Sequence, residues 1–60
     1  MGEEFLVIFE DGFIAAETGA PERFKDDVLA GAATVIKRVD GLYKRMHFRT
    51  ENHSAEWVLV

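Results

Sequence analysis

The sequence predicts a small α+β domain, in which an antiparallel sheet packs against one helix in the chain order ββαβββ. Asp-Gly pairs at residues 11–12 and 40–41 lie between apolar segments, and this arrangement is the strongest short-range signal for a β-hairpin. Residues 21–29 carry the features of a helix between the two hairpins. Because 60 residues suffice for one hydrophobic core only, we expect a single domain over residues 1–60.

The first hairpin begins with the segment FLVIF, residues 5–9, which is apolar at every position. Such a segment is typical of a central strand or of a strand covered on both faces. If the first Asp-Gly pair forms a two-residue type I′ turn, Phe9 lies opposite Ile14 and a second strand covers residues 13–18. Two alanines in that strand leave room for a helix to pack over it.

The helix is expected to begin at Pro21, a residue suited to the first helical position, and acidic residues follow it in the first turns. Phe24, Val28 and Leu29 fall on one helical face. We expect this face to cover the sheet by packing against residues such as Val7, Phe9, Ile36 and Trp57.

Two interpretations of the following segment compete. In the first, the helix ends near Gly31, a strand covers residues 33–39, and the second Asp-Gly pair leads to a strand over 42–49. The β-branched residues of 33–39 favour it, although it places Lys37 opposite Lys44. In the second, a longer helix extends to Arg38 and the order becomes ββαββ. We prefer the first. In both interpretations the chain ends with a polar turn at 50–54 and a strand over 55–60.

Composition narrows the class of protein. There is no cysteine, which excludes disulfides and thiolate metal sites. Apolar residues make up 48% of the chain, which favours a folded domain, and no segment is long enough to span a membrane. The acidic first residues do not resemble a secretory signal, so we expect a cytoplasmic protein. The net charge of −4 divides into −6 over residues 1–31 and +2 over 32–60, a polarity that suits contact with a second copy or a partner.

The motifs FEDG (residues 9–12), TVIKRVDG (34–41) and EWV (56–58) give the chain a resemblance to small proteins encoded by tailed bacteriophages. In that group an F-E-D-G hairpin precedes a short acidic helix, an apolar strand ending in D-G follows, and a strand containing Trp closes the chain. The resemblance implies a phage origin and favours a strand over 33–39. It implies no catalytic residues.

The residues offer no convincing catalytic or cofactor site. His47 and His53 are spaced unlike the ligands of a helical or zinc-finger site. Glu51, His53 and Ser54 share one short turn, where a catalytic triad would need side chains converging from a rigid scaffold. Phosphate-binding glycine motifs are absent from the sequence. We therefore expect a protein that is not an enzyme and uses neither metal nor cofactor.

Protein binding is the function that we expect, with Tyr43 and Trp57 as candidate interface residues because such aromatics dominate binding energy. The protein would act as a small accessory protein, for example by inhibiting a host or defence protein, and it could form a homodimer. A first alternative is nucleic-acid binding by the 37–49 hairpin, although the pI of about 4.9 argues against it. Its candidate contacts are Lys37, Arg38, Lys44, Arg45 and Arg49. A second alternative is a minor structural component of a virion.

Overall fold

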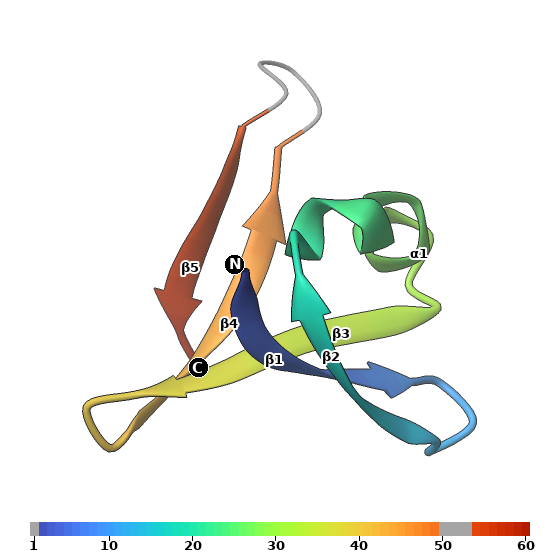
Figure 1. Cartoon of the computed structure of the whole chain (residues 1–60). Coiled ribbons are helices and arrows are strands. Elements are labelled where there is room, and N and C mark those ends of the chain that lie inside the picture. The colour runs from blue at the N-terminus through green and yellow to red at the C-terminus, as the bar shows by residue number, and fades with distance from the viewer. Residues whose placement is uncertain (1, 50–53) are drawn as a thin grey trace.

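The chain folds into one five-stranded antiparallel sheet with the strand order β2-β1-β3-β4-β5, as the computed structural model shows (Figure 1). The structure describes residues 2–49 and 54–60, so residues 50–53 of the expected polar turn lie outside it. A short helical segment separates β2 from β3, which confirms the α+β class and the order ββαβββ. The elements are β1 (Glu3–Phe9), β2 (Ile14–Gly19), η1 (Pro21–Phe24), α1 (Lys25–Leu29), β3 (Ala33–Val39), β4 (Leu42–Phe48) and β5 (Ala55–Leu59).

The first hairpin forms, but the predicted register is wrong by one residue. Ile8, not Phe9, lies opposite Ile14. The backbone N–H of Phe9 donates to the carbonyl of Phe13 at 2.8 Å, and the N–H of Gly12 donates to the carbonyl of Phe9 at 2.8 Å. These bonds close a three-residue loop with Gly12 in the left-handed region at φ 92°, the common alternative to the two-residue turn. The shift moves every β2 side chain to the other face of the sheet.

The second hairpin matches its prediction. Asp40 and Gly41 both have positive φ values, 53° and 82°, as a two-residue type I′ turn requires. Lys37 consequently lies directly opposite Lys44, which is the repulsive pair that the sequence predicts.

The helix is short because a glycine ends it. Gly31 has φ 80°, and its N–H donates to the carbonyl of Val28 at 3.1 Å. The N–H of Ala32 donates to the carbonyl of Asp27 at 2.8 Å. This pair of bonds is the Schellman motif, which closes a helix C-terminus. The longer helix and the order ββαββ are therefore wrong.

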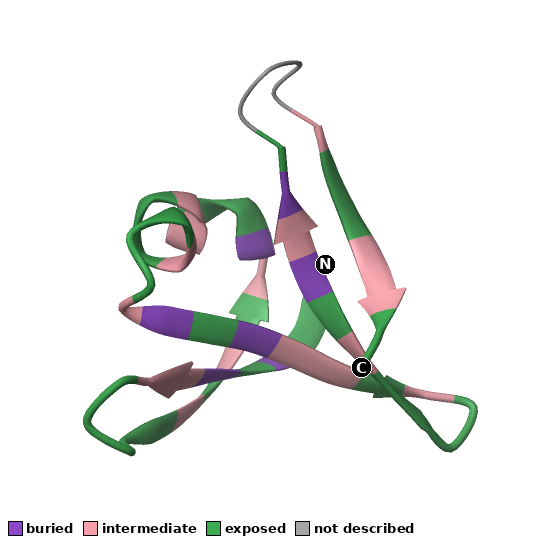
Figure 2. Ribbon diagram, turned by 180° about the vertical axis from the view of Figure 1, so that it is seen from behind, coloured by how far each residue is buried: buried purple, intermediate pink, exposed green. Residues whose placement is uncertain are grey.

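The hydrophobic core lies on one side of the sheet, where the helical segment covers it (Figure 2). Phe24 and Val28 pack against this core as predicted. Leu29, at the last position of α1, is 44% exposed, and the expected contact with Ile36 does not form because Ile36 belongs to the opposite face. The buried residues are Phe5, Val7, Ala33, Val35, Met46 and Phe48, with Phe9 and Trp57 half-buried at their margin.

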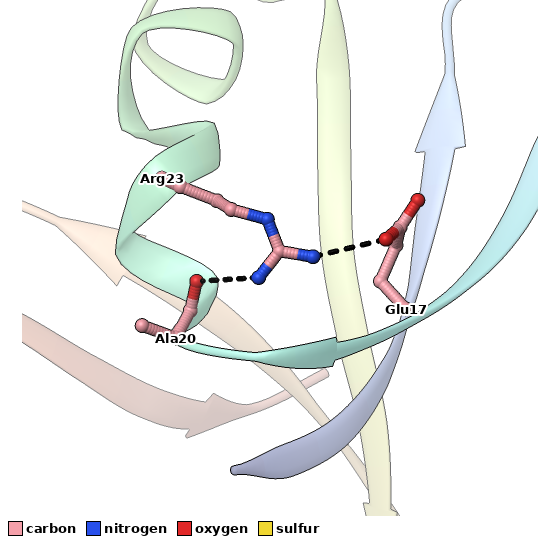
Figure 3. A network of polar contacts seen from close by, with 3 residues as sticks. All are labelled: Glu17, Ala20 and Arg23. Atoms are coloured by element: carbon pink, nitrogen blue, oxygen red, sulfur yellow. Dashed lines mark hydrogen bonds and ion pairs between the residues drawn. The ribbon is translucent and has the colours of Figure 1, made fainter.

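Arg23 fastens the helical segment to the edge of the sheet (Figure 3). Its guanidinium donates to the carbonyl of Ala20 at 3.2 Å and to the carboxylate of Glu17 on β2 at 2.9 Å. The same group lies 5.5 Å from the ring centroid of Phe5 and 5.0 Å from that of Phe24. The Arg23 side chain thus links the helical segment to β2, and it also covers the rings of Phe5 and Phe24.

A candidate protein-binding face

The sheet has a second face that points away from the core, which we call the open face. Side chains alternate along a strand, so the residues between the core residues point to this side. The helical segment packs on the core side, and no described helix covers the open face. The register places these residues on it: Glu4, Leu6, Ile8, Ile14, Ala16, Thr18, Thr34, Ile36, Arg38, Tyr43, Arg45, His47, Glu56 and Val58.

The centre of the open face is apolar and crosses three neighbouring strands. Leu6 on β1 lies opposite Ala16 on β2 and also opposite Ile36 on β3. Leu6 is 37% exposed and Ile14 is 57% exposed. Single exposed apolar residues are normal on a protein surface, but contiguous ones mark interaction sites. Of the two alternatives predicted for residues 5–9, the central strand is therefore confirmed, since β1 lies between β2 and β3, and the described helical segment covers one of its faces.

A shallow hollow of about 370 Å³ lies over this apolar centre. Leu6, Ala16 and Ile36 form part of its lining, and Tyr43, which is 53% exposed, stands at the β4 side. The hollow offers a shaped apolar surface for a side chain from another molecule.

The charges on the open face are separated by strand. Glu4 is the charged residue on the β1–β2 half, whereas Arg38 and Arg45 stand on β3 and β4, and Glu56 on β5 forms an ion pair with Arg49. Within the part of the chain that the structure describes, neither Glu4 nor Arg38 has an ion-pair partner. The guanidinium of Arg38 lies 5.8 Å from the ring centroid of Tyr43, near the limit of a cation–π contact. These charges can pair with groups on a partner.

The two predicted interface residues lie on opposite faces of the sheet. Tyr43 stands on the open face, but Trp57 is half-buried on the core side, opposite Met46. The Nζ of Lys37 lies 4.3 Å from the centroid of the Trp57 ring and covers it. Of the two aromatics, Tyr43 is therefore the one available to a partner at the open face. Sequence reasoning missed Leu6 and the other apolar residues of that face, although the unbroken apolar run of residues 5–9 was a signal for it.

The five predicted nucleic-acid contacts do not form one surface. Lys37 and Lys44 point to the core side, Arg38 and Arg45 to the open face, and Arg49 follows the end of β4. Lys37 forms an ion pair with Glu3 at 2.5 Å, and Arg49 forms one with Glu56 at 3.1 Å. The hairpin thus divides its positive charge between two faces and neutralises part of it.

The described residues, 2–49 and 54–60, also bear on metal binding and membrane spanning. These residues hold no group of three or more His, Asp or Glu side chains placed to bind a metal ion. They also hold no helix long and apolar enough to cross a membrane. His53, a member of both the histidine pair and the Glu-His-Ser group considered in the sequence, lies outside the described residues, as does Glu51.

Comparisons with known proteins add no relative: a scan against protein-family models, a search of curated proteins and a search of solved structures each found no match. The open face is therefore the feature of the molecule from which a function can be proposed.

Proposed function

We propose that this chain is a non-enzymatic accessory protein that acts by binding protein, and that the open face is its contact surface. The observation that carries the proposal is the uncovered apolar centre of the sheet, where Leu6, Ala16 and Ile36 lie on three neighbouring strands and line one hollow with Tyr43. Burying such a patch against a partner gains roughly 25 cal/mol for each Å² of apolar surface removed from water.

The composition of the open face also supports protein binding. Interfaces combine an apolar centre with a polar rim, and Tyr and Arg are enriched among the residues that contribute most binding energy. Here Tyr43, Arg38 and Arg45 stand beside the apolar residues on the same side of the sheet. A partner would bury the apolar centre and meet the charges around it.

Site-specific photocrosslinking in bacterial cells tests this proposal. We would place benzoylphenylalanine at Tyr43 on the open face and, in a matched control, at Leu29, which is exposed on the helix. The expected result is a protein adduct from position 43 and none from position 29. No adduct from position 43, or equal adducts from both positions, would refute the assignment of this face.

Nucleic-acid binding is the second candidate, because Arg38, Arg45 and Tyr43 share the open face. Basic side chains with an adjacent aromatic can follow phosphates and stack a base. The test is binding to single-stranded oligonucleotides over a range of salt concentrations. This function requires steep salt dependence and loss of binding in Arg38→Glu/Arg45→Glu, with smaller loss in Lys44→Glu on the core side. Unchanged binding in the double variant excludes it.

The phage origin and the inhibition of a host or defence protein are proposals drawn from the resemblance to phage proteins. A structural role in a virion is distinguished from them by looking for the chain in purified particles. An inhibitor should instead be found with its target in the lysate of infected cells.

A further inference from the structure

We infer that the partner of the open face is a second copy of this chain, joined across a two-fold axis that runs along the line between β1 and β3. We call this line the β1–β3 seam. The inference rests on the proposed function, since it names the molecule that covers the same face. It predicts a two-layered sandwich, the usual way in which a sheet buries a second apolar face.

The register makes the open face complementary to itself across the seam. Leu6 of β1 lies opposite Ile36 of β3. The β1–β3 pairing ends at this pair, and just beyond it Glu4 on β1 and Arg38 on β3 both line the hollow of the open face. A two-fold axis along the seam lays β1 of one copy over β3 of the other, because rotation exchanges the two sides of the seam. Leu6 then meets the partner's Ile36, and Glu4 meets the partner's Arg38, each contact occurring twice.

Charge selects this axis over the perpendicular one. An axis perpendicular to the strands lays each strand over its own copy, so that Arg45 on β4 approaches the partner's Arg45. The axis along the seam instead brings Glu4 of each copy over the β3 side of the other, where Arg38 stands. Glu4 and Arg38 have no ion-pair partner in the described part of the monomer, and in this dimer each of them gains one.

The size of the surface also fits a dimer. A standard interface buries about 800 Å² of each partner, roughly a fifth of the 4274 Å² surface of this chain. A second copy that covers the open face would have to bury about that share of each chain. A 60-residue chain without disulfides also gains much from oligomerisation, because its own core is small.

The first test is the mass of the purified protein in solution, by sedimentation equilibrium and light scattering. We expect twice the 6.8 kDa of the monomer. Leu6→Glu should give a folded monomer, because Leu6 contributes to the open face and not to the core. Leu29→Glu, on the exposed end of the helix, should remain a dimer. Circular dichroism of each variant verifies that the sheet is intact.

The second test is a charge exchange across the proposed contact. Glu4→Arg alone and Arg38→Glu alone should each weaken dimerisation about tenfold or more, since two attractive pairs become two repulsive pairs. The double variant Glu4→Arg/Arg38→Glu should restore the affinity. A merely structural effect of either substitution would add in the double variant instead of cancelling.

The outcomes separate this inference from the proposed function. A wild-type protein that is monomeric up to about 1 mM, near the weak end of measurable affinities, overturns the homodimer. So does a dimer that persists in Leu6→Glu, or a double variant without recovery. If crosslinking from position 43 then captures a different protein, the proposed function stands while the homodimer falls. If position 43 captures no protein, both fall.

Discussion

Replacing Lys44 should stabilise the protein, because the second hairpin places this lysine directly opposite Lys37. If the two ammonium groups are taken as about 7 Å apart in water, their repulsion is 332/(80 × 7), or about 0.6 kcal/mol. Lys44→Gln removes this repulsion and should raise the free energy of unfolding by about 0.6 kcal/mol at low salt. Lys44→Glu replaces it with an attraction of similar size, for a total gain of about 1.2 kcal/mol.

The same neutralisation at Lys37 should act in the opposite direction. The side chain of Lys37 is 18% exposed, forms an ion pair with Glu3 and covers the ring of Trp57. Lys37→Gln loses a cation–π contact of about 0.5–2 kcal/mol and an ion pair of about 0.2–1 kcal/mol. These losses exceed the 0.6 kcal/mol gained from the lost repulsion, so we expect a net destabilisation of about 1 kcal/mol.

Thermal unfolding followed by circular dichroism, at one fixed protein concentration, measures these differences. For a domain of this size 1 kcal/mol corresponds to about 4–8 °C in Tm. Lys44→Glu should therefore melt about 5–10 °C above the wild type at 10 mM salt, and the gain should shrink at 1 M NaCl because salt screens the charges. The repulsion between Lys37 and Lys44 is refuted if Lys44→Glu melts below the wild type, if salt leaves the gain unchanged, or if both glutamine variants shift Tm in the same direction.

Three further substitutions test the packing and the turns. Val35 is fully buried on the central strand, so Val35→Ala should lower the free energy of unfolding by about 1.5–3 kcal/mol in urea titrations; a change below 0.5 kcal/mol would contradict its place in the core. Gly41→Ala should cost about 1 kcal/mol, since Gly41 has φ 82°, and Gly41→Asn should lose less. Arg23→Lys cannot bond both Ala20 and Glu17. Hydrogen exchange should therefore become faster at the helix amides before it does at the sheet amides. Equal acceleration in both would argue against a local role of Arg23.

The turns explain which parts of the fold the sequence could predict. The second Asp-Gly pair takes the two-residue form, and the strands around it follow as expected. The first pair takes the three-residue form, in which the side chain of Asp11 accepts a hydrogen bond from the N–H of Phe13 at 3.0 Å. Both forms are compatible with Asp-Gly, so the dipeptide alone could not determine the register. Gly31 decided between helix and strand for residues 33–39, because its left-handed conformation ended the helix.

The candidate site was harder to predict than the fold, because it depends on which face each residue occupies. Tyr43 and Trp57 belong to different strands, and their relative sides follow only from the register of β4 against β5. Leu6 and Ile36 read as ordinary strand residues in the sequence. Their place on an uncovered face is a tertiary property, since the helical segment that the structure describes covers the opposite face of the sheet.

The β1–β3 seam also bears on how fast the chain folds. The other three strand pairings of the described sheet join strands that are consecutive in the chain, whereas the seam brings together residues as far apart as Leu6 and Ile36. Closing this longest loop costs the most chain entropy, and the stabilising contacts across the seam form only after the loop has closed. Folding speed should therefore be limited by the meeting of two preformed units, the first hairpin and the three-stranded remainder, and the brief glycine-ended helix keeps the connection between them short.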